Sequence, residues 1–351
     1  MKLKHLTGMI FFQIISLSSI GQTCDEIALA QKKTSWKFEE TRLSPTKDKH
    51  LLKQKAVALT LRKIIVDAYP QPTGCEARWN DFYHDQYTYE TYYNGIYNST
   101  AMFFKFGCGY NKKEYVADET GTTVQISVNS ENLLGMGSVI LNDTEYVARR
   151  VPMGMKDGAY YYQREPDGLY YSTTGGKFDR VYVFTLPGKQ PYIPISRKEF
   201  LGIAVEHFKK MQQKVVQSAK EMKDLKWREG YLSRETKRNT VSGNEFEHLL
   251  KTTSEADLVK PAIIEMGHGS ALMDENLNFP GFYDKEDPKK NLGCISRENK
   301  DYFDKKLRIT TVQLITVHIQ GHNAYSPVLA NVIKECDQKM DFKAIGALIG
   351  K

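Results

Sequence analysis

The 351-residue sequence lacks the short motifs that mark common catalytic and nucleotide-binding sites. It contains no GxSxG serine elbow, no HExxH pair, no GxxxxGKS or GxxxxGKT phosphate loop and no GxGxxG turn. Its cysteines form no CxxC or CxxxC pair, which argues against a structural zinc site, and His318 and His322 lie on and after an expected strand rather than on one helical face. We therefore expect no cofactor and no metal site.

Long apolar runs are also missing after residue 21, and a membrane-spanning helix needs about 20 apolar residues. Residues 1–21 have a basic start, an apolar stretch over 6–20, and small residues, Ser19 and Gly21, at the −3 and −1 positions of a signal-peptidase site. We expect 1–21 to be a cleaved secretory signal and the mature protein to be periplasmic or secreted, without a transmembrane segment. The alternatives are an N-terminal membrane anchor and a lipoprotein acylated at Cys24.

The chain lacks a strong excess of charge of one sign. It has 49 Lys and Arg against 42 Asp and Glu, and removal of 1–21 takes away two of the lysines. The basic residues concentrate between Arg197 and Arg238, but acidic residues are mixed among them. A nucleic-acid interface would need a one-sided basic face, so we expect no nucleic-acid partner.

Cysteines are few and odd in number. The five are Cys24, Cys75, Cys108, Cys294 and Cys336, so at least one is unpaired or pairs between chains. Export permits disulfides. We predict that any intrachain bridges are Cys75–Cys108 and Cys294–Cys336, because each pair joins segments within one expected domain and closes a loop of about 30–45 residues.

The pattern of apolar residues predicts one helix followed by strands. The helix is expected from the cap residues Ser44 and Pro45 to Pro70, with an apolar stripe from Val57 to Ala68. Short turns join successive strands in antiparallel sheets, and the sequence has such turns at Asn142-Asp143 and Pro166-Asp167-Gly168. Strands are expected at 122–129, 139–141, 145–151, 160–163, 169–172 and 181–186.

A long central helix is expected from Ser196, which forms a capping box with Glu199, to at least Leu225. Its residues follow a heptad pattern with one polar member: Leu201, Ala204, Phe208, Met211, Val215, Ser218, Met222 and Leu225. Two interpretations remain open. The 201–225 seam either mediates self-association as a coiled coil or lies on the protein's own domain.

These elements predict an α+β fold: an N-terminal helix with an antiparallel β-meander, a long central helix, and a smaller α/β C-terminal part. The expected division is a 1–21 signal, a 22–195 domain, a 196–257 long helix with a polar linker, and a 258–351 segment. Residues 228–257 are polar, with Ser242-Gly243 in the middle and one short helix expected from Glu245 to Lys251, and they are interpreted as a linker or mobile flap. The 258–351 segment has strands at 262–264 and 309–319 and helices at 326–337 and 341–349, and it either completes the first sheet or stands alone.

Three segments together carry a resemblance: Pro191–Pro194 running into Arg197–Leu201, then Asn299–Leu307, and Asp341–Ala344. They resemble segments of an uncharacterised family of exported bacterial proteins. The resemblance implies export and a single evolutionary unit, and it implies no activity.

Tyrosine is the unusual feature of the composition, with 21 residues in the chain. Tyrosines crowd the 83–97 segment and the 159–172 segment, and a tyrosine ring offers a flat apolar face with a polar tip, suited to a glycan or peptide ligand. We interpret Tyr161 and Tyr171 as candidate binding residues. The simpler interpretation is that these rings are half buried in strands.

One residue is a candidate for catalysis. His268 lies between two glycines in a loop after an apolar strand, a common place for site residues. Ser270 lies two residues after His268 but not in the frame of a GxSxG serine elbow, and the simpler interpretation of this segment is a glycine turn. The sequence therefore favours an exported binding or envelope-associated structural protein over an enzyme. The alternative is a secreted hydrolase that acts on extracellular polysaccharide or peptide through carboxylates, which leave no local signature.

Overall fold

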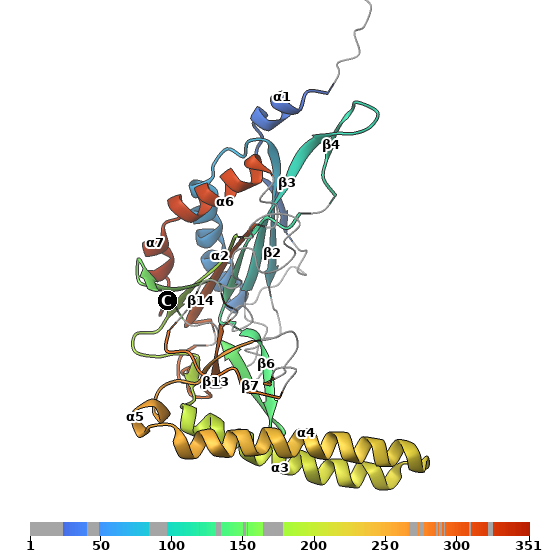
Figure 1. The fold of residues 1–351 in the computed structure, drawn as a ribbon. Helices are drawn as coiled ribbons and strands as arrows, with labels where there is room; N and C mark the ends of the chain where they lie inside the picture. The colour runs from blue at the N-terminus through green and yellow to red at the C-terminus, as the bar shows by residue number, and fades with distance from the viewer. Residues whose placement is uncertain are drawn as a thin grey trace, which may run out of the picture.

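The computed structural model describes residues 24–40, 49–83, 97–118, 120–130, 135–149, 152, 154–163, 178–266, 272–273, 277–285, 287, 290, 292–308, 310–321 and 326–351. Within these residues, a 9-stranded sheet forms the body of the protein (Figure 1). The strand order is β1 (Lys37–Glu40), β2 (Cys75–Tyr83), β3 (Tyr97–Cys108), β5 (Thr123–Val128), β14 (Leu314–Gly321), β10 (Phe178–Thr185), β9 (Ala159–Gln163) and β8 (Gly154–Lys156), and β4 (Glu114–Val116) pairs with β3. The β1–β2 pair is parallel and the other pairs are antiparallel.

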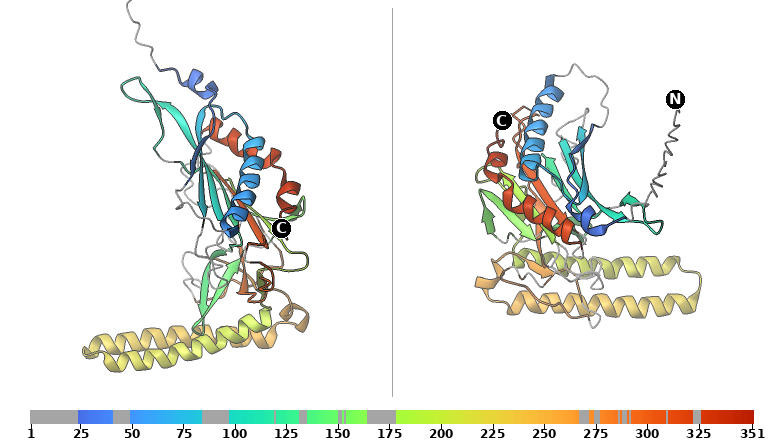
Figure 2. Two further views of the ribbon diagram at one scale, coloured as in Figure 1. Left: turned by 180° about the vertical axis from the view of Figure 1, so that it is seen from behind. Right: turned by 90° about the horizontal axis from the view of Figure 1, so that it is seen from above.

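Helices cover one face of this sheet. They are α2 (Lys49–Ala68), α6 (Pro327–Lys339) and α7 (Phe342–Gly346), as Figures 1 and 2 show. Strand β10 illustrates how the sheet is buried on both faces. Tyr182 and Phe184 belong to the core under the helices, whereas Val181 and Val183 belong to a smaller core on the opposite face. Alternation along a strand produces this division.

A second, 5-stranded sheet lies below the first in Figure 1 and has the order β11 (Tyr192–Pro194), β13 (Leu292–Glu298), β7 (Thr144–Arg149) and β6 (Gly135–Leu141), with β12 (Ile263–Glu265) paired to β13. Beneath it runs a hairpin of two long helices, α3 (Arg197–Glu221) and α4 (Leu225–Thr252), followed by α5 (Glu255–Leu258). We call residues 197–252 the arm. Its distal half projects beyond the sheets (Figures 1 and 2).

The α+β class is confirmed, and several local predictions agree with the structure. Val124, Ile126 and Val128 share the core face of β5. Asn142 and Asp143 both have positive φ angles, 51° and 60°, as a type I′ hairpin turn between β6 and β7 requires. The strand at 181–186 is buried on both faces as expected and corresponds to β10.

The predicted turn at 166–168 and the predicted strand at 169–172 lie outside the described residues. The predicted strand at 160–163 is part of β9, which pairs with β10 and β8 and follows a turn at Asp157-Gly158 with φ angles of 50° and 87°. The expected boundaries at 195 and 258 do not separate the sheets. The C-terminal β14 lies between β5 and β10, so the last segment completes the first sheet.

The predicted linker or flap at 228–257 is wrong, because α4 occupies 225–252. The sequence also predicts that the long helix continues to at least Leu225, but α3 ends at Glu221 and the chain reverses through Met222–Asp224. The heptad pattern holds from Leu201 to Val215 and then drifts, because Ala219 is buried and Ser218 is exposed. A straight helix has 3.6 residues per turn, so a strict heptad cannot stay on one face.

The composition of α4 explains why the pattern of apolar residues did not reveal it. Its buried residues are Asn239, Ser242 and Phe246, so only one of the three is apolar. Small side chains allow close packing, and a Cβ atom added at Gly243 would lie 3.5 Å from the Phe208 Cβ atom. A helix whose stability comes from such packing carries little sequence periodicity of its own.

Candidate functional site

The predicted site residues do not form one site in the described structure. His268 and Tyr171 lie outside the described residues. Tyr161, on β9, is half buried, with its ring centroid 6.2 Å from that of Tyr182, and it packs against the main core. Tyr97 is buried, and its hydroxyl donates to Asp81 at 2.6 Å. The described tyrosines that are exposed are Tyr110, between β3 and β4, and Tyr115, on β4.

Tyr161→Ala is expected to destabilise the protein by about 1–3 kcal/mol, because it removes a half-buried ring from the core. Tyr110→Ala is the matched control, since that side chain is fully exposed at the β3–β4 turn. Urea unfolding of both variants checks this. Equal stability of the two variants would show that the Tyr161 ring does not stabilise the core, and Tyr161 would again be a candidate binding residue.

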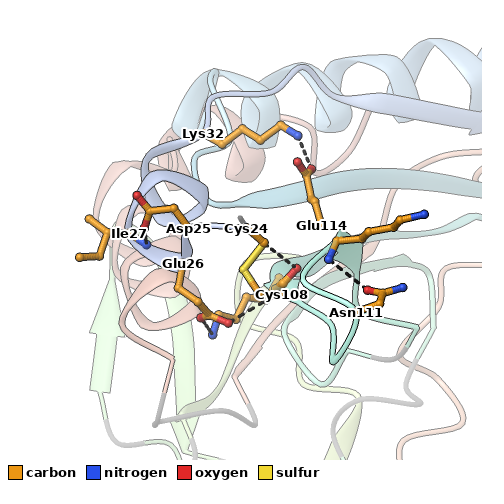
Figure 3. Close-up of a disulfide and its surroundings, with 11 residues drawn as sticks. Cys24, Asp25, Glu26, Ile27, Lys32, Cys108, Asn111 and Glu114 are labelled. Carbon is orange, nitrogen blue, oxygen red and sulfur yellow. Dashed lines mark hydrogen bonds and ion pairs between the residues drawn. A yellow bond between two sulfur atoms is a disulfide. The ribbon is translucent and has the colours of Figure 1, made fainter. Parts of the chain in front are cut away.

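A disulfide joins Cys24 to Cys108 at the end of the body opposite the arm (Figures 1 and 3). Around it, the Glu26 carboxylate accepts from the Cys108 backbone N–H at 3.3 Å, and Lys32 forms an ion pair with Glu114. The lipoprotein alternative does not fit this structure, because a sulfur in a disulfide carries no lipid. The bridge instead fixes the start of the described chain, including α1 (Glu26–Gln31), to the C-terminal end of β3.

Both predicted disulfides are therefore wrong. Cys75, Cys294 and Cys336 are free and buried. In the antiparallel register Cys75 faces Lys105, so Cys108 lies beyond the end of β2 and out of its reach. Cys294 lies on β13 of the second sheet, whereas Cys336 lies on α6 in the main core. Burial raises the pKa of both Cys75 and Cys336 to about 12, which suppresses their thiolate forms.

The polar cluster nearest in sequence to His268 does not resemble an acid–base site. The Tyr283 hydroxyl donates to Glu265 at 2.8 Å, and the Lys290 ammonium donates to the Tyr283 oxygen at 2.7 Å. The hydrogen bond to Tyr283, with the charge of Glu265, raises the pKa of Lys290 above its ordinary value. A lysine that holds its proton more tightly is a poor nucleophile or base.

The arm is fixed to the body by a cluster of phenylalanines. The Phe246 ring lies 5.7 Å from Phe208, 6.1 Å from Phe200 and 5.1 Å from Phe279, measured between centroids. These rings share one core with Ile195, Ile264 and Ile295 and other residues of the second sheet. The proximal part of the predicted 201–225 seam thus packs within its own chain, so the base of the arm behaves as part of the body.

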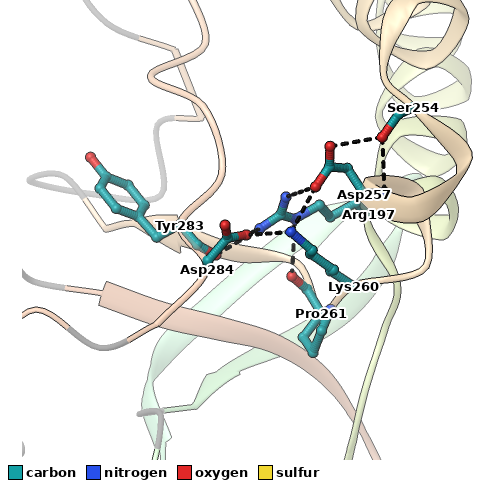
Figure 4. A network of polar contacts seen from close by, with 7 residues as sticks. All are labelled: Arg197, Ser254, Asp257, Lys260, Pro261, Tyr283 and Asp284. Atoms are coloured by element: carbon teal, nitrogen blue, oxygen red, sulfur yellow. Dashed lines mark hydrogen bonds and ion pairs between the residues drawn. The ribbon is translucent and has the colours of Figure 1, made fainter.

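A polar network reinforces this base (Figure 4). Arg197, the first residue of α3, is 6% exposed and donates to the Tyr283 carbonyl at 2.8 Å and to Asp284 at 2.6 Å. Lys260 adds ion pairs to Asp257 at 2.7 Å and to Asp284 at 3.3 Å. Arg197 and then Lys260 lower the pKa of Asp284. Lys260, with Ser254, lowers the pKa of Asp257. The network joins the start of the arm to the segment that follows its end.

The β6–β7 turn supports the middle of the arm. The Asn142 backbone N–H donates to the His207 Nδ1 atom at 3.0 Å, and Asp143 forms ion pairs with Lys210 and Lys214. These two lysines hold the pKa of Asp143 at about 2. Burial, followed by the charge of Lys214, lowers the pKa of His207 below its ordinary value, so neutral His207 remains an acceptor.

This contact predicts a dependence of stability on pH. Well above pH 7, His207 is neutral in both the folded and the unfolded chain. As the pH falls through about 6.5, the unfolded chain binds a proton there that the folded chain excludes, so the free energy of unfolding decreases. His207→Gln should flatten the curve between pH 7 and pH 5.5, and His248→Gln, on the exposed face of α4, is its control. Equal slopes in wild type and His207→Gln would refute the contact's role.

The distal end of the arm carries exposed apolar side chains. Trp227 is 69% exposed, Leu225 61% and Val216 48%. Asp224 caps α4 by accepting from the Trp227 backbone N–H at 2.8 Å, which fixes Leu225 and Trp227 in the first turn. Lys214 is the last residue of α3 that forms an ion pair with the β6–β7 turn, and α3 continues for seven residues beyond it. The end of α3 therefore lies about 10 Å beyond this contact.

The positive charge of the protein concentrates on the same part of the arm. Residues 209–238 contain ten Lys or Arg and four Asp or Glu, a net of six positive charges, in a chain whose net charge is +7. Near the body, Lys209, Lys210 and Lys214 form ion pairs with carboxylates. Toward the tip, Lys220, Lys223 and Lys226 are exposed and form no ion pair with any described residue.

Other site classes find no support among the described residues. No group of three or more His, Cys, Asp and Glu is placed there to hold a metal ion. No helix in that part of the chain is long and apolar enough to cross a membrane. In comparisons with known proteins, no family model matches the chain, and neither a curated protein nor a solved structure is significantly similar to it.

Proposed function

We propose that the protein is an exported, non-catalytic binding protein of the cell envelope, and that the arm is its recognition element. The observation that carries this proposal is the arm itself. Its base is fixed to the second sheet by phenylalanines, whereas its far end bears Leu225 and Trp227 largely exposed. An exposed tryptophan adds nothing to the core, and aromatic side chains of this kind are enriched where proteins contact partners.

The proposal moves the recognition element from the expected Tyr161 surface to the arm, because Tyr161 packs against the core. Export rests on the signal-like pattern of residues 1–21, and the Cys24–Cys108 disulfide is compatible with an oxidising compartment. An envelope location would place the basic arm among anionic polymers and surfaces, which its charge favours.

Sedimentation with isolated bacterial envelope tests this function. The purified protein is mixed with washed envelope fragments, and the fraction that pellets is measured. We expect wild type to pellet and a Leu225→Ser/Trp227→Ser variant to remain in the supernatant. The control is Leu52→Ser/Met155→Ser, which removes apolar side chains of similar exposure, 58% and 62%, from the body. Wild type that stays in the supernatant, or pelleting that the arm variant retains, would contradict the proposal.

A further inference from the structure

We propose that the arm tip, residues 215–238, docks on the surface of an anionic phospholipid bilayer, with Trp227 and Leu225 entering the headgroup region and the nearby lysines contacting phosphates. This inference rests on the proposed function and names the partner that the tip fits. Four observations lead to it: the shape of the tip, its apolar residues, its lysines and its position in the molecule.

The tip is a protrusion formed by two helix ends and the three-residue connection between them (Figure 1). Because these side chains protrude and do not line a pocket, a partner that binds them must surround them. A bilayer does so because its headgroup region closes around inserted side chains. Leu225 and Trp227 are in the first turn of α4, beside the connection, so they reach such a surface before the body does.

The apolar residues suit shallow insertion. Trp227 combines a large apolar ring with an indole N–H, and tryptophans of this kind gather at the level of the headgroups, where one end is apolar and the other wet. Leu225 adds apolar surface directly after the same connection, and Val216 adds apolar surface five residues before the end of α3. The set is too small to span a membrane and matches the depth of an interfacial anchor.

The lysines provide charge complementarity to an anionic surface. Lys220 precedes the connection, Lys223 lies in it and Lys226 follows it, all within seven residues of Trp227. Their long stems let each ammonium reach phosphate while the backbone stays outside the bilayer. Of the acidic residues among them, Asp224 accepts the Trp227 N–H in the helix cap, and Glu221 and Glu229 are exposed. Basic residues near an anionic membrane attract it, and salt weakens that attraction.

The position of the tip leaves it accessible. The phenylalanine cluster and the Arg197 network hold the base of the arm, while the disulfide and the start of the described chain lie at the opposite end of the body (Figures 1 and 2). A bilayer at the tip would therefore meet the helix ends first. A protein or polysaccharide partner remains an alternative outcome of the experiment below.

Tryptophan fluorescence with lipid vesicles tests the inference. The chain has three tryptophans, and Trp36 and Trp79 are 9% and 0% exposed in the body core, so a spectral change on binding reports Trp227. With vesicles of phosphatidylcholine and phosphatidylglycerol, 3:1, at low salt, we expect a blue shift and quenching by lipids brominated near the headgroup. With pure phosphatidylcholine, or at high salt, we expect binding at least tenfold weaker.

Variants separate the two contributions. K220Q/K223Q/K226Q and Leu225→Ser/Trp227→Ser should each weaken vesicle binding at least tenfold, as measured by vesicle flotation. The lysine control is K113Q/K305Q/K306Q, which changes three exposed lysines of the body. All variants should unfold at the wild-type urea midpoint, because the altered side chains are at the surface. Absent vesicle binding, or equal binding by a tip variant and its control, would overturn the inference.

The envelope assay tests the proposed function, and the vesicle assay tests the bilayer inference, so a negative result in one can be distinguished from a negative result in the other. If the protein pellets with envelope through its arm but ignores anionic vesicles, the partner is an envelope protein or polysaccharide, and the bilayer inference is wrong while the proposed function stands. If it binds neither, both are wrong. Binding to a soluble polyanion that survives Leu225→Ser/Trp227→Ser, without vesicle binding, would show that the basic residues act as a general anion surface and would also overturn the bilayer assignment.

Discussion

Phe246→Ala is expected to lower the free energy of unfolding by about 3–5 kcal/mol, the usual cost of removing a large ring from a packed core. Phe246 is fully buried and contacts Phe200 and Phe208 of α3 and Phe279 of the segment between β12 and β13. The cavity therefore opens where the arm joins the body. Urea unfolding measures the total effect.

The loss should be concentrated in the arm. Hydrogen exchange should accelerate more in α4 than in α2, because α4 has few buried apolar residues apart from Phe246. Trp227→Ser, on the same helix, is the matched control and should change stability by less than about 0.5 kcal/mol. A Phe246→Ala variant as stable as wild type would mean that the arm is not anchored through this ring.

Removing the disulfide is the second change with a large expected effect. The bridge spans 84 residues of sequence. Closing a loop of that length in the unfolded chain accounts for about 4.5 kcal/mol in the chain-entropy treatment. Cys24→Ser/Cys108→Ser should therefore be less stable by about 3–5 kcal/mol. Reductant should destabilise wild type to the same level and leave the double variant unchanged.

Counting thiols checks the pairing directly. The native protein should react slowly with a thiol reagent, because Cys75, Cys294 and Cys336 are buried. Unfolding without reductant should expose three thiols, and unfolding with reductant five. Reaction of a single thiol in the non-reduced unfolded protein would instead indicate two bridges, as the sequence had suggested.

Local pattern predicted the sheet better than the connections. Val124, Ile126 and Val128 alternate with polar residues, and two-residue alternation needs no knowledge of distant segments. The same holds for the turn at Asn142-Asp143, whose residue types tolerate positive φ angles. The sequence does not predict which strands pair, because β14 lies between β5 and β10, which are more than a hundred residues away in the sequence.

The arm shows why the candidate site was only partly predictable. The α3 half has an apolar stripe and a capping box, and both features predict a helix from the sequence alone. The α4 half packs against α3 through Ser242 and Gly243, whereas by sequence alone Ser-Gly indicates a linker. The exposure of Trp227 depends on where the chain reverses between α3 and α4. The sequence does not show that position, because the heptad pattern continues through it to Leu225. Likewise, no sequence rule brings Cys24 to Cys108.

The place of β14 in the main sheet has a consequence for how the chain folds. The strands on either side of it, β5 and β10, are complete by residue 185, but their common neighbour begins at Leu314. Until it arrives, each flanking strand presents an open edge, and such edges pair readily with other chains. Pairings this distant in sequence also form slowly. During synthesis the core of the first sheet therefore stays open until β14 has been made, and a chain truncated before residue 314 should aggregate rather than fold.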